Sequence, residues 1–401
     1  MTPASNQPVC GVCGTKLVKN GKTSAGRTRW RCKGCGSSAT QSRADVTRKA
    51  QLNTFLGWLL GKTSQRQAGG GTGRSLRFST AWCWNIEVPP PEPTGEVHRQ
   101  IIVDGTYFNG WCALIAHNGQ HVIGWQWCDR ESKAAWVALF KRFPAPDVVV
   151  TDGGTGLRAA LDQQWRRTRI QRCFFHIRAA VVRHTTLNPR LEAGQEILAL
   201  TRELMRVQDL DAAAAWMGDY AWWEAKWSSF LKQRTYAKKG LERPVWAKPN
   251  QNWWYTHIQL RRVQGLYRQL IRDKSLFTFL DQDYVSQGIR TVERATSRLE
   301  GGPNSAIKHL LRHHRGMPET HTRKAVDWLL NSLTEHPHDP RELLQRHHRA
   351  AEQTAKHKPE PEEPLGPQSY GTATTAEEGL WARKGGPEDP DTPGLYTHSC
   401  L

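Results

Sequence analysis

The sequence contains no long hydrophobic run. Its longest apolar stretches are far shorter than the ~18 residues that a membrane-spanning helix needs. The N-terminus also lacks a charged region followed by the roughly 7–15 apolar residues of a secretory signal peptide. These two absences argue against a membrane partner and against secretion, so we expect a cytoplasmic protein.

Acidic residues are almost missing from the first part of the chain. Residues 1–85 carry fourteen Lys or Arg but a single acid, Asp45, and the net charge of the whole chain is +19. Such a charge favours a polyanionic partner, usually nucleic acid, because each neutralised phosphate releases counterions. The basic N-terminal part therefore predicts contact with DNA, although solubility alone is an alternative explanation.

Four of the nine cysteines lie near the N-terminus as two Cys-x-x-Cys pairs. Eighteen residues separate the pair Cys10 and Cys13 from the pair Cys32 and Cys35. This spacing is typical of a zinc site in which each pair offers two thiolates to a tetrahedral ion. Disulfides are the alternative, but a reducing cytoplasm disfavours them. We predict a zinc ribbon with one structural Zn²⁺ over residues 1–43.

Basic side chains surround these cysteines. Four thiolates leave no open position for a catalytic water, so the ribbon is expected to contact DNA rather than to act on it. The candidate contacts are Arg27, Arg29, Arg31 and Lys33.

Residues 44–60 carry apolar residues at helical spacing, which predicts a helix. Further on, "FSTAWCWNI" predicts another helix that holds Trp82 and Trp84, with Ser79 or Thr80 as its cap. The set is similar to a helix-turn-helix, and a small helical linker domain is the alternative. With the proline-rich linker that follows, this segment spans 44–97.

The apolar pattern changes to that of β-strands from residue 99. The segments "RQIIVDGTY", "WCALIAH" and "HVIGWQW" predict an antiparallel meander. A helix, a fourth strand in "PDVVVTDGG", a second helix and a fifth strand in "TRIQRCFFH" follow. This order predicts an α/β fold with a ribonuclease-H-like core, whose first part spans residues 98–186.

Two of these predicted strands end on an aspartate that precedes a glycine, namely Asp104 and Asp152. A carboxylate in an apolar setting is costly unless a cation meets it. The first and fourth strands of a ribonuclease-H-like sheet are neighbours, so both carboxylates would face one cleft and share a divalent cation. The alternative is two unrelated aspartates that cap turns.

A third acidic segment holds Glu293 and Glu300. Three carboxylates that hold two Mg²⁺ (or Mn²⁺) ions ~4 Å apart would activate water or a DNA 3′-hydroxyl and stabilise the leaving oxygen. The sequence therefore predicts metal-dependent phosphoryl transfer.

The strings "VDGTY", "VTDGG", "CFFH" and "TSRLEGG" resemble the DDE transposases of the insertion-sequence-256 and Mutator superfamily, from the ribbon to about residue 330. The resemblance implies Asp104, Asp152 and Glu300 as the catalytic metal ligands, with Glu293 in reserve. The Gly-Gly-Pro that follows Glu300 predicts a break in its helix.

The resemblance also implies a helical insertion over residues 187–287 and closing helices over residues 288–334. It gives an accessory role to Cys173 and His176, as the Cys-x-x-His at the end of the fifth strand, and to Asn304. For the Cys-His pair, a buried cysteine beside an ordinary capping histidine is the alternative.

The end of the chain has two predicted parts. "PNSAIKHLLRHHRGM" predicts a helix whose polar side offers Lys308, Arg312 and Arg315 to DNA. Residues 335–401 lack periodicity and are acidic towards their end, so we predict a disordered tail.

Together these features predict a transposase associated with the bacterial nucleoid. It would bind double-stranded DNA at the terminal inverted repeats of its own element, cleave a strand and join the 3′-hydroxyl to target DNA. The resemblance implies a homo-oligomer on paired ends. The rival hypotheses are a non-catalytic zinc-containing DNA-binding regulator derived from a transposase and a ribonuclease-H-like nuclease that stops at hydrolysis.

Overall fold

The computed structural model describes most of the chain. The described residues are 8–10, 13–24, 26, 28–39, 44–69, 72–108, 110–238, 242–245, 247–281 and 292–356. By its internal contacts the chain divides into Met1–Leu344 and Gln345–Leu401. No helix within the described residues combines the length and the apolar character needed to cross a membrane.

Three short antiparallel strands form the N-terminal sheet: β1 (Leu17–Lys22), β2 (Thr28–Cys32) and β3 (Ser38–Ala39). Leu17 lies opposite Cys32, and both are buried together with Cys10. Because the described residues of this core include only three that are buried, hydrophobic burial alone gives the sheet little stability.

The predicted helix over residues 44–60 is confirmed. Four elements follow one another here: α1 (Ala44–Leu59), α2 (Gln65–Gly69), α3 (Arg74–Thr80) and the 3₁₀ helix η1 (Ala81–Asn85). Thr80 stands at the N-cap position of η1, which holds both tryptophans, as predicted. Its side chain makes no capping hydrogen bond there, because the hydroxyl donates to the carbonyl of Leu76 at 2.7 Å.

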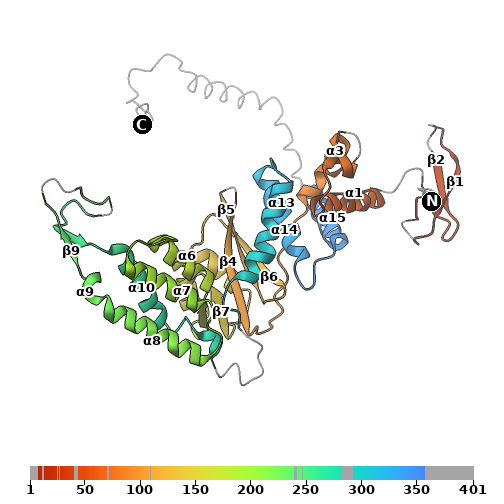
Figure 1. Ribbon diagram of the computed structural model, residues 1–401. Helices are drawn as coiled ribbons and strands as arrows, with labels where there is room; N and C mark the ends of the chain where they lie inside the picture. Colours follow the sequence, from red (N-terminus) through yellow and green to blue (C-terminus); the bar gives the residue numbers. More distant parts are fainter. Residues whose placement is uncertain are drawn as a thin grey trace, which may run out of the picture. The chain divides into compact units, whose positions relative to one another are not determined.

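A mixed five-stranded sheet forms the centre of the fold (Figure 1), in the order β6-β5-β4-β7-β8. Its strands are β4 (Gln100–Phe108), β5 (Trp111–His117), β6 (Val122–Cys128), β7 (Val148–Thr151) and β8 (Arg169–Arg172). The first three pair antiparallel, and β7 pairs in parallel with both β4 and β8. The predicted meander and the α/β class are thus confirmed.

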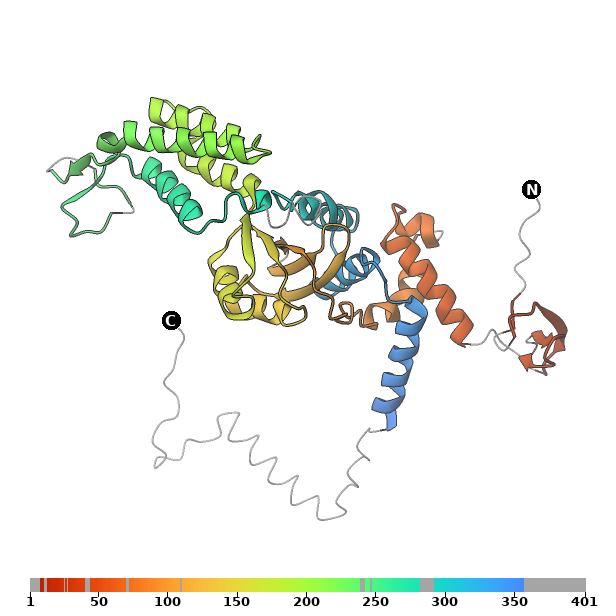
Figure 2. The ribbon, with the colours of Figure 1, turned by 90° about the horizontal axis from the view of Figure 1, so that it is seen from below.

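The sheet is covered on both faces. Helices α4 (Lys133–Phe140) and α5 (Thr155–Gln164) pack against the face that buries Ile101 and Val103 (Figure 2). Ile102 points to the other face, which is covered in part by α6 (Phe174–Thr185). Successive side chains of a strand alternate between the two faces of a sheet. Asp104, two positions after Ile102, therefore also lies on the side covered by α6.

The segment predicted as a helical insertion is largely helical. It contains α7 (Glu192–Leu204), α8 (Leu210–Lys226), α9 (Ser228–Leu231), the hairpin of β9 (Arg234–Tyr236) and β10 (Trp253–Tyr255), α10 (Ile258–Arg272) and the 3₁₀ helix η2 (Thr278–Leu280). Trp216 and Trp223 are buried in its core, whereas Trp222 is 61% exposed.

The C-terminal part begins with a broken helix. Its elements are α12 (Ser297–Leu299), the π-helical turn η3 (Glu300–Asn304), α13 (Ser305–His313), α14 (Glu319–Ser332) and α15 (Pro340–Lys356). The break predicted after Glu300 is confirmed: Gly302 has non-helical angles and Pro303 follows. Helix α14 contacts β6, where the indoles of Trp125 and Trp127 donate to Asp327 Oδ1.

The prediction of disorder over residues 335–401 was wrong for its first part. Helix α15 starts beside Asp339, whose carboxylate accepts from the backbone N–H of Arg341 at 2.8 Å. Leu343 and Leu344 are buried. The two buried leucines and the hydrogen bond to Asp339 stabilise α15. The polar composition of the region gave no indication of these contacts. Residues 357–401 lie outside the described residues.

Candidate functional site

The four N-terminal cysteines converge on one point. None of the four forms a disulfide, and their sulphur atoms lie within 4.8 Å of one another. The Sγ–Sγ distance is 3.3 Å between Cys13 and Cys32 and 3.5 Å between Cys10 and Cys35. A tetrahedral zinc thiolate with Zn–S near 2.3 Å requires sulphur spacings of about 3.8 Å. The cluster therefore fits one Zn²⁺.

The basic residues predicted to contact DNA are exposed wherever they are described. Arg29, Arg31 and Lys33 are exposed in or beside β2, and Arg27 lies outside the described residues. Lys308 and Arg312 are exposed on α13, and Arg315 is exposed just after it. Exposure leaves these cations available to phosphates.

Asp152 directly follows β7, but Asp104 lies in the middle of β4, which continues to Phe108, so the prediction that the first strand ends at Asp104 was wrong. Strands β4 and β7 pair in parallel as far as Ile102 opposite Val150, and each aspartate comes two residues later in its chain segment. Ile102 and Val150 both pack in the core on the α6 side. Because the side chains alternate, both aspartates belong to that same face.

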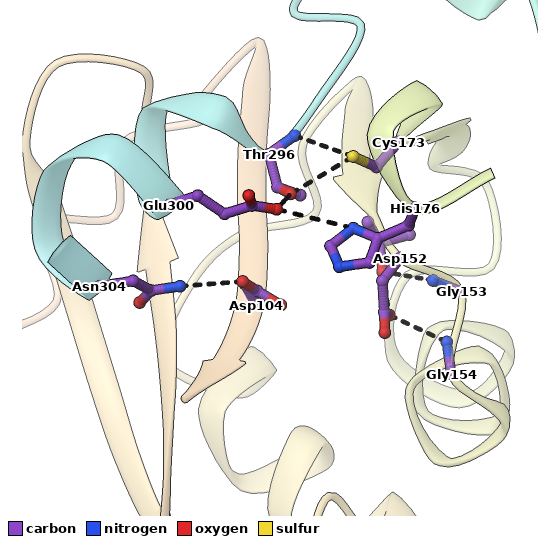
Figure 3. A network of polar contacts seen from close by, with 10 residues as sticks. Asp104, Asp152, Gly153, Gly154, Cys173, His176, Thr296, Glu300 and Asn304 are labelled. Carbon is purple, nitrogen blue, oxygen red and sulfur yellow. Dashed lines mark hydrogen bonds and ion pairs between the residues drawn. The ribbon is translucent and has the colours of Figure 1, made fainter. Parts of the chain in front are cut away.

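Asp104 is held by Asn304. The side-chain Nδ2 of Asn304 donates to Asp104 Oδ2 at 2.9 Å (Figure 3), and the Thr106 hydroxyl donates to Asn304 Oδ1 at 2.6 Å. Asn304 is buried, and the hydroxyl fixes which end of its amide faces Asp104. The contact connects the end of β4 to the π-helical turn η3.

Asp152 begins the turn into α5. Its Oδ1 accepts from the backbone N–H of Gly154 at 3.0 Å, and Gly153 has a left-handed φ of 81°. The Arg172 guanidinium packs over Gly153, so closely that a Cβ on Gly153 would lie 1.5 Å from it. Arg172 is thus a cation next to Asp152, which the sequence analysis missed.

Glu300, the first residue of η3, faces α6. Its Oε1 accepts from the Thr296 hydroxyl at 3.0 Å and lies 3.8 Å from His176 Nδ1 (Figure 3). The reserve candidate, Glu293, pairs instead with Arg298 at 3.1 Å.

The three predicted metal ligands do not form one compact ligand set. Within the described residues, only two groups of Cys, His or acidic ligand atoms lie within 4.8 Å of one another. One is the N-terminal cysteine cluster, and the other combines Cys173, His176 and Glu300. Asp104 and Asp152 share a face, whereas Glu300 is turned towards the Cys-His pair.

The acids nevertheless act on one another through their charges. Burial, with a further contribution from the negative charges of Asp152 and Glu300, raises the pKa of Asp104 to about 6, although His176 opposes this. A divalent cation would remove the mutual repulsion.

A fourth acid, Glu131, lies in the same place. A Cβ on Gly105 would lie 2.5 Å from Glu131 Oε1, so this carboxylate rests on the backbone beside Asp104. Burial, followed by the charges of Asp152 and Asp104, raises the pKa of Glu131 to about 7. The sequence gives no sign of this role, because Glu131 directly precedes Ser132, the N-cap of α4, and acidic residues are common at helix N-termini.

Cys173 and His176 lie at the start of α6, where Cys173 is the N-cap, and not at the end of a strand as predicted. The strand ends at Arg172 because the Cys173 carbonyl already accepts the first helical hydrogen bond, from Ile177. The Thr296 N–H donates to the Cys173 sulphur at 3.2 Å. Interaction with Cys173 raises the pKa of His176 to about 9.

Comparisons with known proteins give one family. Residues 112–243 match the sequence model described as "Transposase, Mutator family". The matched stretch contains Glu131, Asp152, Cys173 and His176. The comparison with curated proteins gave no match. Over this third of its length the chain is similar to transposases of the Mutator family.

Proposed function

We propose that the protein is a DDE transposase that cleaves DNA at the ends of its own insertion sequence and joins them to target DNA. The observation that carries the proposal is the parallel register of β4 and β7, in which Ile102 pairs with Val150 two residues before Asp104 and Asp152. The strand order and directions support a ribonuclease-H-like core.

The donor set of the proposed site suits magnesium. Carboxylate oxygens are the ligands that Mg²⁺ and Mn²⁺ prefer, and burial together with the neighbouring acids raises the pKa of Asp104, a penalty that a bound cation would relieve. Asp104, Asp152 and Glu300 would hold two such ions. When bound, these ions would lower the barrier to in-line attack on a phosphate by water or a 3′-hydroxyl.

The chain's own residues prepare this site. Asn304 orients Asp104, and the N–H of Gly154 orients Asp152. Glu300 would join them by turning its carboxylate away from His176. Glu300 and Asn304, which contacts Asp104, belong to the same π-helical turn.

The DNA would be bound by several parts of the chain. We assign the terminal inverted repeats to the zinc ribbon (residues 1–43) and the helix-turn-helix-like segment (44–97), through Arg29, Arg31 and Lys33. Lys308, Arg312 and Arg315 would contact the strand near the acids. The core would comprise residues 98–186 and 288–334, interrupted by the insertion 187–287, and the active form would be a homo-oligomer on paired ends.

The decisive experiment compares carboxylate variants of similar size. Purified protein is incubated with Mg²⁺ and DNA that carries the element ends, and nicked and joined products are separated on a denaturing gel. Asp104→Asn, Asp152→Asn and Glu300→Gln should each lose more than the ~10–100-fold typical of residues outside the ligand set. Glu293→Gln, whose carboxylate pairs with Arg298, is the matched control and should retain activity.

The same gel tests the rival functions. Nicks without joined products would favour a ribonuclease-H-like nuclease. DNA binding without any product would favour the non-catalytic regulator, and loss of activity in Glu293→Gln but not in Glu300→Gln would reverse the assignment of the third ligand.

A further inference from the structure

Three groups of different chemistry meet where α6 and η3 approach each other. They are the Cys173 thiol, the His176 imidazole and the Glu300 carboxylate, and one ligand atom from each lies within 4.8 Å of the other two. His176 Nδ1 and Glu300 Oε1 are 3.8 Å apart. None of the four ribbon cysteines takes part, so the cluster is separate from the N-terminal one.

This donor set is not suited to magnesium. Thiolate and imidazole are ligands for zinc and related transition metals, whereas Mg²⁺ prefers oxygen. Around a tetrahedral zinc ion, with Zn–N and Zn–O near 2.1 Å and Zn–S near 2.3 Å, ligand atoms are spaced by about 3.4–3.8 Å. The nitrogen–oxygen spacing is at the lower end of this range, so His176 and Glu300, 3.8 Å apart, would approach by about 0.4 Å, and the distances to the sulphur would contract by about 1.2 Å at most.

An independent observation points to a missing ligand. His176 Nδ1 is buried, and no described residue offers it a hydrogen bond. A buried polar atom without a partner is costly, and few remain so in folded proteins. This nitrogen is the one that faces Glu300 (Figure 3), so a metal ion between them would satisfy it.

The surroundings of the sulphur are those of a thiolate ligand. Cys173 is fully buried, and the backbone N–H of Thr296 points at its sulphur from 3.2 Å. N–H donors of this kind commonly support metal-bound groups from outside the ligand set.

We propose that Cys173, His176 and Glu300 form a second zinc site, with a fourth position open to water. This site goes beyond the proposed function, because it takes a thiophilic ion. Glu300 would serve it while its carboxylate faces His176, and would serve the magnesium site only after the carboxylate has turned away. Zinc binding there requires no DNA and no magnesium.

The test is the zinc content of the full-length protein. The protein is exposed to excess Zn²⁺, freed of loosely bound ions by gel filtration, and analysed by atomic emission. The wild type should carry two zinc ions per chain, and Cys173→Ser and His176→Asn one each. Cys128→Ser is the matched cysteine control outside both clusters and should carry two. His176→Asn provides a second, partly exposed position should Cys173→Ser fail to fold.

Cobalt substitution locates the second ion. Both the ribbon and the proposed site give thiolate-to-cobalt absorption, and the difference between wild type and Cys173→Ser isolates the contribution of the proposed site. One zinc ion in the wild type, or two in both Cys173→Ser and His176→Asn, would overturn the proposal. Asp152→Asn separates the two questions, because it should lose the proposed DNA cleavage but still bind two zinc ions.

Discussion

Asn304 donates a hydrogen bond from Nδ2 to Oδ2 of Asp104 at 2.9 Å, and the two residues are 200 positions apart in the sequence. The Thr106 hydroxyl fixes the amide from its other end. The contact joins η3 to the end of β4, so the segment with the third acid is tied to the strand with the first. An Asn rather than an Asp at this position provides a donor without adding another negative charge.

Asn304→Ala should reduce Mg²⁺-dependent DNA cleavage by about 10–100-fold, as is typical when a group that orients a metal ligand is lost. The loss should appear as a higher Mg²⁺ concentration for half-maximal rate, because Asp104 is no longer oriented. Thr106→Val leaves the Asn304–Asp104 contact possible and should have a smaller effect. An unchanged Mg²⁺ dependence in Asn304→Ala would contradict the role assigned to the amide.

Glu131→Gln should stabilise the metal-free protein against unfolding but reduce the additional stabilisation that Mg²⁺ provides. The pKa of Glu131 is raised to about 7, so above that pH the wild type carries a buried charge that the neighbouring acids repel. In Mg²⁺-free buffer at pH 8 the variant should be more stable by about 1–3 kcal/mol. This gain should fall as the pH drops below 7 and vanish near pH 4, where Glu131 is protonated in both the folded and the unfolded state.

The same substitution should weaken the response to magnesium, because one negative charge near Asp104 and Asp152 is lost. Thermal unfolding with and without Mg²⁺ measures both effects. The control is Asp129→Asn, which removes a neighbouring charge whose side chain is 77% exposed. It should change neither the stability in Mg²⁺-free buffer nor the stabilisation by Mg²⁺. If Glu131→Gln kept the full Mg²⁺-induced shift of the melting temperature, Glu131 would have no part in the metal site.

Asp327→Asn tests a purely structural carboxylate. Burial raises the pKa of Asp327 to about 6, although the indoles of Trp125 and Trp127 donate to it. The unfolded chain loses this proton near pH 4, so the folded state is penalised as the pH rises from 4 to 6. At pH 7 the variant should be about 2–3 kcal/mol more stable than the wild type.

The difference should close as the pH falls to about 4, since Asp327 is then neutral in both states. Urea unfolding at several pH values measures it. An advantage of the variant that stays constant from pH 4 to pH 7 would show that the buried charge is not its cause.

The N-terminal sheet should depend on zinc for its fold. Its core holds only Cys10, Leu17 and Cys32, and small domains of this kind gain their folding free energy from the metal. Cys13→Ser should lose one zinc ion, become sensitive to protease over residues 8–39 and bind DNA more weakly. The unfolding of the five-stranded sheet should not change, and a protease-resistant ribbon in metal-free buffer would refute this dependence.

Much of the fold could be predicted from the sequence, because local residue patterns determine these strands and helices. Alternation and Asn-Gly turns predicted β4 to β6, and the Gly-Gly-Pro after Glu300 predicted the break that became η3. Contacts between residues far apart in the chain could not be predicted from the sequence. Nothing near Glu131 in the sequence shows that its carboxylate rests on Gly105, because that contact depends on how α4 returns to the sheet. Likewise, the direction in which Glu300 points depends on Thr296 and His176 rather than on its own neighbours.

Adjacent glycines after Asp152 allow a matched test of the local geometry. Gly153 has a φ of 81°, and its Cα faces the Arg172 guanidinium, so a methyl group there would displace the arginine and strain the backbone. Gly154 has an ordinary φ of −52°, and a Cβ on it would meet Asp152 Oδ1 only at 3.7 Å.

Gly153→Ala should therefore lower the free energy of unfolding by about 1–3 kcal/mol, as strained left-handed positions typically do, and should reduce cleavage because Asp152 is displaced with the turn. Gly154→Ala should change each by much less. Urea unfolding and the cleavage assay, run on both variants, check this. Equal losses in the two variants would mean that the packing of Arg172 over Gly153 does not control the position of Asp152, and that the turn tolerates a side chain at neither place.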